Sequence, residues 1–208
     1  MFAPYWTAEP GWHSEFQLRN NMDKGSLTVT PVLRLYTGSE VALTPVTIQP
    51  ADVVNVDVAQ ELQKASPAIA EQAGTYGSVV FKYNAVHFRN LYAAVMVHET
   101  GQPIGYHIDA FGTNDDEGNA WTREGIWWLP RPNVRDNLIV SNASDKPNQS
   151  RLFLYDAAGK AWHQDIPLAP RQTVRLVVGD LVKAAGLTGA YGGITLPHND
   201  SEAINQHG

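Results

Sequence analysis

The chain contains no cysteine among its 208 residues, which excludes disulfide bonds, thiolate metal sites and a cysteine nucleophile. Charged residues make up only 17% of the sequence, and no run of lysine and arginine occurs. With a formal net charge of −6, we expect neither a nucleic-acid-binding surface nor binding to an anionic membrane. No apolar stretch approaches the roughly 18 residues of a membrane span, so no spanning segment is expected.

The motifs of several common enzyme classes are also missing. There is no GxSxG nucleophile elbow, no phosphate loop and no dinucleotide fingerprint. We therefore predict a protein that is not an enzyme. The start, MFAPYWTAEP, lacks the basic segment and apolar core of a signal peptide. The architecture inferred below nevertheless leads us to expect an exported protein whose leader is absent from this sequence.

The strongest feature that is present is an internal repeat. The segment from Trp6 matches the segment from Trp128 without a gap as far as Lys24 and Lys146. Farther on, AGTYGSVVFKYN (residues 73–84) matches TGAYGGITLPHN (residues 188–199). The second copy stops before any counterpart of roughly residues 94–125. We therefore predict two units, the second of which lacks its last strands.

Each copy reads as short strands separated by turns. Strands are predicted at residues 27–36, 41–48, 76–83, 91–98 and 104–111, and short helices at 57–65 and 179–186. Strand spacing close to 8–12 residues is typical of β-sandwiches. The predicted fold class is all-β: two tandem antiparallel immunoglobulin-like sandwiches, residues 1–125 and 126–208, each with one short helix.

Several residues recur in both copies, and together they carry a resemblance. They are Asn20 and Asn142, Asp23-Lys24 and Asp145-Lys146, Tyr36 and Tyr155, and Tyr76-Gly77 and Tyr191-Gly192. The pattern is similar to tandem β-sandwich units in secreted bacterial proteins of unknown function. The resemblance implies an exported structural or adhesive module and names no ligand.

The repeated residues are of scaffold type. An asparagine side chain bonds nearby backbone in a turn, a tyrosine buries its ring while its hydroxyl stays in water, and a glycine permits close backbone approach. A feature that occurs twice serves both copies. Residues that two copies share are more often part of the scaffold than catalytic. We interpret these residues as structural.

Two metal sites are open alternatives to this interpretation. His98, His107 and Asp109 lie on adjacent predicted strands, and imidazole with carboxylate suits zinc. The polar loop at residues 114–119 offers oxygen ligands that suit calcium. Neither matches a complete ligand motif, so surface histidines and a solvated acidic loop are favoured. No cofactor is predicted, and zinc and calcium are left open.

Tryptophans gather at the ends of the copies. Trp12 and Trp121 would suit an aromatic platform for a sugar ring. Trp6, Trp127 and Trp128 precede equivalent strands, so packing at a domain junction is the simpler interpretation.

The leading hypothesis is an extracellular structural or adhesive module, a filament subunit whose second sandwich is completed by a strand from a neighbour. Its partners would be copies of itself or neighbouring domains of a longer chain. The alternatives are a carbohydrate-binding module with a glycan partner and a metal-dependent enzyme.

Overall fold

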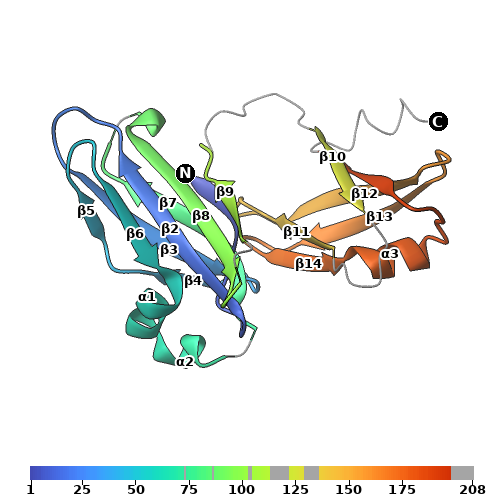
Figure 1. The fold of residues 1–208 in the computed structure, drawn as a ribbon, viewed down its shortest axis with the longest axis horizontal. Coiled ribbons are helices and arrows are strands. Elements are labelled where there is room, and N and C mark those ends of the chain that lie inside the picture. The colour runs from blue at the N-terminus through green and yellow to red at the C-terminus, as the bar shows by residue number, and fades with distance from the viewer. Residues whose placement is uncertain (73, 86, 103–104, 113–121, 129–135, 198–208) are drawn as a thin grey trace. The chain divides into compact units, whose positions relative to one another are not determined.

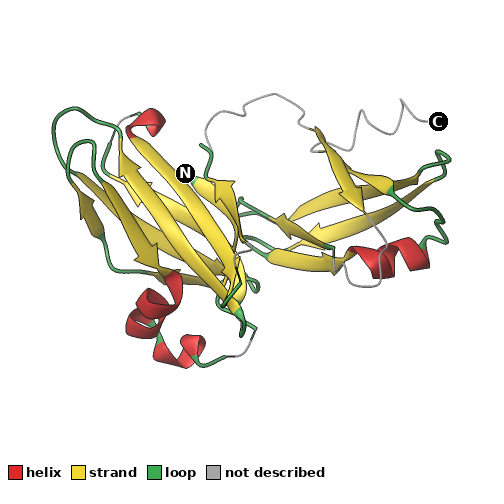
Figure 2. Ribbon diagram, viewed as in Figure 1, coloured by secondary structure: helices red, strands yellow, loops and turns green. Residues whose placement is uncertain are grey.

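The computed structural model describes residues 1–72, 74–85, 87–102, 105–112, 122–128 and 136–197. The chain forms two compact units, one containing strands β1–β9 and the other β10–β15 (Figures 1 and 2). All paired strands with a defined register are antiparallel. The predicted all-β class, built from antiparallel sandwiches with few short helices, is confirmed. Among the described residues, no helix has the length and apolar character needed to cross a membrane.

The first sheet of unit 1 has the order β1-β7-β3-β4, with β5 also paired to β3. Its strands are β1 (Phe2–Thr7), β3 (Leu27–Leu35), β4 (Glu40–Ala42), β5 (Val46–Ile48) and β7 (Tyr76–Tyr83). Strand β3 alternates Leu27, Val29 and Pro31 on one face, and all three are buried. This alternation gives the sheet an apolar face for the sandwich core.

The second sheet of unit 1 has the order β6-β2-β8-β9. Its strands are β2 (Trp12–Asn20), β6 (Val53–Asp57), β8 (Leu91–Glu99) and β9 (Gly105–Asp109). Phe16 and Leu18 of β2 are fully buried, opposite Val95 and Ala93 of β8. The ring of Phe16 meets Phe81 of the other sheet edge-on, with centroids 5.1 Å apart. The core of unit 1 therefore lies between these two sheets.

Short helices connect the two sheets. Helix α1 (Val58–Ala65) begins where the Asp57 carboxylate accepts the Gln60 N–H at 2.9 Å, a standard N-cap. Helix α2 (Pro67–Ala70) follows directly, because Pro67 suits the first turn of a new helix. A 3₁₀ turn, η1 (Phe88–Asn90), precedes β8. In unit 2, helix α3 (Val178–Ala184) takes the place of α1 and buries Val178, Leu181 and Val182.

Unit 2 reproduces one sheet of unit 1 in full. Its larger sheet has the order β10-β15-β12-β13, and its smaller sheet is β11-β14. The strands are β10 (Thr122–Trp128), β11 (Asn137–Ser141), β12 (Asn148–Asp156), β13 (Ala161–Leu168), β14 (Thr173–Val177) and β15 (Gly192–Pro197). By the repeat, β11 and β14 correspond to β2 and β6. Among the described residues of unit 2, no strand corresponds to β8 or β9.

The predicted boundary between residues 125 and 126 differs from the structure. It falls inside β10, because Thr122 and Arg123 already pair with Pro197 and Leu196 of β15. In the same way, β1 begins four residues before Trp6. The edge strand of each unit therefore starts upstream of its tryptophan, Trp6 in unit 1 and Trp128 in unit 2.

The predicted equivalence of Tyr36 and Tyr155 is also corrected. Gly77 pairs with Leu35, whereas its counterpart Gly192 pairs with Asp156, so Tyr155 corresponds to Arg34. The hairpin turn sets this register. Gly38 and Gly159, with φ of 93° and 83°, hold the same place in the two turns. The two tyrosines therefore stand two positions apart in the repeat.

Asn20 and Asn142 make the same three hydrogen bonds in the two units. Asn20 Nδ2 donates to the carbonyls of Gly25 and Ile48 at 3.0 and 3.1 Å, and its Oδ1 accepts the Met22 N–H. In the same way, Asn142 Nδ2 donates to the carbonyls of Lys146 and Ala169 at 2.8 and 2.9 Å, and its Oδ1 accepts the Ser144 N–H. Both residues are buried. Each asparagine thus joins the turn after its strand to the end of a strand in the other sheet of its unit, β5 in unit 1 and β13 in unit 2.

We expect Asn142→Asp to lower the free energy of unfolding of unit 2 by about 2–4 kcal/mol. An aspartate keeps the acceptor for Ser144 but loses both donors, and its carboxylate faces the Lys146 and Ala169 carbonyls. The matched control is Asn148→Asp, because exposed Asn148 uses only its Oδ1, as an acceptor from Gln149. Urea unfolding checks both variants. Equal midpoints for them would contradict the structural role of Asn142.

Candidate functional site

The outward face of the sheet β6-β2-β8-β9 carries the three side chains that sequence analysis considered as zinc ligands, His98, His107 and Asp109. Residues directly opposite each other on antiparallel strands share a face. His13 pairs with His98, Met96 pairs with His107, and Ala94 pairs with Asp109. All of these therefore project from the same face of unit 1, away from the core. The same face carries two separate groups of side chains.

The first group is His13, Glu15 and His98. The Nε2 atom of His13 lies 3.3 Å from the Glu15 carboxylate, and the His13 and His98 rings stack with centroids 5.2 Å apart. One nitrogen or oxygen of each residue lies within 4.8 Å of the others. A second carboxylate, that of Asp57 on β6, lies 3.9 Å from His13 Nε2. These side chains are half-buried or exposed, so solvent ions reach them.

The predicted metal set of His98, His107 and Asp109 does not form a cluster. His98 faces Gly105 across the β8–β9 pair and stacks instead on His13 of β2. Asp109 accepts a hydrogen bond from the Tyr92 hydroxyl at 2.8 Å, and His107 is exposed. The strand register is the cause, since it sets His107 opposite Met96 rather than opposite His98.

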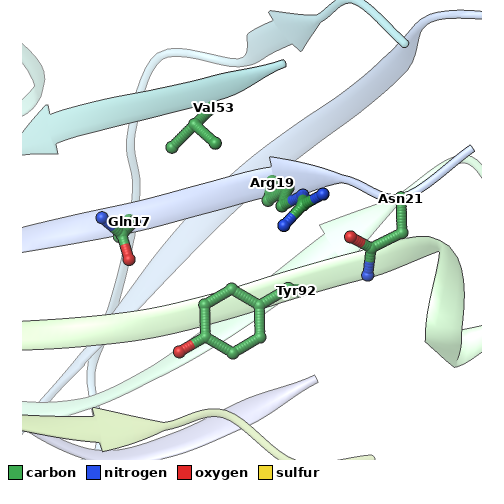
Figure 3. A pocket seen from close by; sticks show the side chains of 5 residues that line it. All are labelled: Gln17, Arg19, Asn21, Val53 and Tyr92. Atoms are coloured by element: carbon green, nitrogen blue, oxygen red, sulfur yellow. The ribbon is translucent and has the colours of Figure 1, made fainter. Parts of the chain in front are cut away.

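The second group lines a pocket of about 410 Å³ at the other end of the same face. Its lining residues are Gln17, Arg19, Asn21, Val53 and Tyr92 (Figure 3). The hydrogen bond to Asp109, together with partial burial, raises the pKa of the Tyr92 phenol. Tyr92 therefore stays a neutral donor held by Asp109. The pocket combines an aromatic ring with a guanidinium and two amides.

Trp12 stands apart from both groups. Its side chain is 39% exposed at the start of β2. Because Trp12 and His13 are neighbours on a strand, they project to opposite faces. The predicted partner in the sugar platform, Trp121, lies outside the described residues, as does the candidate calcium loop at 114–119.

Trp6 and Trp128, for which the sequence suggested a domain junction, are both buried. Trp6 is fully buried, lies opposite Gly77, and donates from Nε1 to the Ser78 carbonyl at 2.7 Å. Trp128 is 1% exposed in the core of unit 2, opposite Gly192. In unit 2 the glycine on the neighbouring strand, Gly192, leaves room for the indole ring of Trp128. Trp127 lies in β10, and its side chain is outside the description.

The third site is a backbone edge rather than a set of side chains. Strand β11 pairs with β14 and with no other strand of the described part of the chain. In unit 1 the corresponding strand β2 lies between β6 and β8 and pairs with β8 over its whole length. The other edge of β11 is therefore the position where unit 1 has β8.

The direction of the backbone groups on β11 follows from three hydrogen bonds, two in unit 1 and one in unit 2. Neighbouring residues of an antiparallel strand direct their N–H and C=O groups to opposite sides. In unit 1, Asn20 N–H donates to Asp52 beside β6, and Asn21 N–H donates to Asn90 beside β8. In unit 2, the Asp136 carbonyl accepts the Val178 N–H at 2.9 Å, toward β14. The N–H of Ile139, three positions on, therefore points away from β14.

Sequence reasoning missed His13 and Glu15. Their signal was present, because His13 and Glu15 alternate with the apolar Phe16 and Leu18 on one predicted strand. The pairing of His13 with His98 was not readable, since it depends on the register between strands that lie 85 positions apart.

Fold and sites together define a class: a tandem β-sandwich protein with a polar, histidine-bearing sheet face and one sheet of only two described strands. In comparisons with known proteins, no family model, no curated protein and no solved structure matches the chain.

Proposed function

We propose that the protein is an extracellular structural module that acts by association rather than catalysis. In this proposal the second sandwich accepts a strand from a neighbouring copy along β11. The observation that carries it is the difference between two equivalent sheets: β6-β2-β8-β9 in unit 1 and β11-β14 in unit 2. A sheet edge that pairs with no strand is a template for another strand.

The chemistry of unit 1 indicates what kind of strand would fit. The inward residues of β8 are Leu91, Ala93, Val95 and Val97, and all are buried. On β11 the inward residues are Leu138 and Val140, the counterparts of Phe16 and Leu18. An extended donor with alternating apolar side chains would cover them while its backbone pairs with β11. Because donor and acceptor surfaces differ, the contact is head-to-tail and extends into a filament.

The test is a peptide with the sequence of β8, LYAAVMVHE, extended by lysines for solubility. In sedimentation velocity, the full chain is expected to show a weight-average mass that rises with concentration. Saturating peptide should return it to the monomer mass, because the peptide occupies the β11 edge. A scrambled peptide of equal composition is the control. A chain that stays monomeric at every concentration, or that ignores the β8 peptide, would refute the proposal.

The extracellular location is part of the proposal and rests on the resemblance to secreted tandem sandwiches. Fractionation of the native cells with an antibody against unit 1 tests it, and recovery only in the cytosol would reject it.

A further inference from the structure

We propose that His13, Glu15 and His98 form a binding site for a divalent transition-metal ion of the zinc class. The site lies wholly in unit 1 and is independent of the strand-accepting edge. It is built by two neighbouring strands: His13 and Glu15 stand two apart on β2, and His98 lies directly opposite His13 on β8. Alternation and pairing place all three side chains on one face of the sheet.

The spacing of the ligand atoms is close to what such an ion requires. A tetrahedral ion with bonds of about 2.0–2.1 Å holds its ligand atoms about 3.3 Å apart. His13 Nε2 and Glu15 Oε1 are already 3.3 Å apart, and all three ligand atoms lie within 4.8 Å of one another. The two imidazole planes are 20° from parallel. Closure on the ion therefore needs one ring to turn about its Cβ–Cγ bond, which a half-buried side chain on a sheet face can do.

A further oxygen is available from the third strand. Asp57 pairs with Glu15 across β2 and β6, and its Oδ2 lies 3.9 Å from His13 Nε2. Its other oxygen, Oδ1, caps helix α1 by accepting the Gln60 N–H. The cap fixes the carboxylate while Oδ2 stays directed toward the cluster. A bound ion would thus connect β6, β2 and β8 at one point.

The ligand types decide the class of ion. Two imidazoles with one or two carboxylates suit zinc and its neighbours, whereas calcium and magnesium take oxygen ligands almost alone. Calcium should therefore not compete for this site. The site also differs from the His98, His107 and Asp109 set, because β9 contributes no ligand to it.

The test is a zinc titration of the tag-free full chain against a chromophoric chelator. We expect one site per chain with a dissociation constant in the micromolar range or tighter. His13→Gln and His98→Gln should each weaken binding at least tenfold, and Glu15→Gln about threefold or more. His107→Gln, an exposed histidine on the same face, is the matched control and should bind as the wild type does. A tenfold excess of calcium should leave the titration unchanged.

Weak binding, defined as a dissociation constant above about 100 μM, would overturn the proposal. Loss of affinity in His107→Gln equal to that in His98→Gln would overturn it as well. Circular dichroism confirms that the variants are folded. Cobalt supplies a second readout, because its visible absorption band reports nitrogen and oxygen ligation directly and should disappear in His98→Gln.

Discussion

Replacing Gly192 with alanine is expected to lower the free energy of unfolding of unit 2 by about 3 kcal/mol or more, enough to leave much of this unit unfolded. A Cβ atom at this position would overlap both the Tyr155 carbonyl and the indole ring of Trp128. Neither obstacle can yield cheaply, since one is backbone and the other is a fully buried ring in the core. Trp128 and Gly192 thus form a single packing unit across β10 and β15.

The next residue supplies the control for this prediction. Gly193 is also in β15, and a Cβ built on it meets no atom within 4 Å. Gly193→Ala is therefore expected to change stability by less than about 1 kcal/mol, with a small gain from the loss of glycine flexibility. Guanidinium unfolding followed by tryptophan fluorescence compares the two. Similar midpoints would show that the close approach at Gly192 is not required.

Gly77 extends the same test to unit 1. Its Cβ would overlap the Arg34 carbonyl, although Trp6 is not among its nearest atoms. Gly77→Ala should therefore destabilise unit 1 and leave the transition of unit 2 in place. The pair of variants assigns each unfolding transition to one unit.

The second large effect is expected at the edge of β11. Ile139→Pro should weaken self-association of the full chain about tenfold or more. Proline removes the N–H that points away from β14, and its ring obstructs an incoming strand. A lost inter-strand hydrogen bond and this obstruction together exceed about 1.4 kcal/mol, the equivalent of a tenfold change. The ladder to β14 keeps its donors, because the N–H groups of Leu138 and Val140 face that side.

Ile139→Ala separates the backbone effect from the side chain. It shortens the same residue but keeps the N–H, so it should associate nearly as the wild type does. Sedimentation equilibrium gives the association constant of each protein, and thermal unfolding shows whether unit 2 stays folded. Equal weakening in both variants would assign the contact to the isoleucine side chain and reject strand addition at β11.

The sequence predicted the fold class because its signals are local. Alternation in residues 27–36 and 91–98, the turn at Gly38, and the proline after α1 each fix a strand or helix without reference to distant residues. The repeat then carried these assignments into the second copy. Among the described residues of unit 2 no strand corresponds to β8 or β9, which is the feature on which the proposed function depends.

The remaining errors concern contacts between strands. Tyr36 and Tyr155 were matched by residue type, but the glycine turn shifts the register by two positions. The pairing of Trp6 with Gly77 and of Trp128 with Gly192 was not predicted, because these glycines lie about 70 residues away in sequence. His98 was grouped with His107 rather than with His13 for the same reason. Pairing register over long separations is a tertiary property that no local pattern specifies.

The most direct test of strand addition is amide hydrogen exchange at Ile139, measured by NMR on the full chain at low and high concentration. The N–H of Ile139 points to the edge that an added strand would occupy, whereas the N–H of Val140 points to β14. The proposal predicts that exchange at Ile139 slows as the chain associates, while exchange at Val140 is slow at both concentrations. Rapid exchange at Ile139 in the associated protein, or protection of Ile139 that does not depend on concentration, would contradict it.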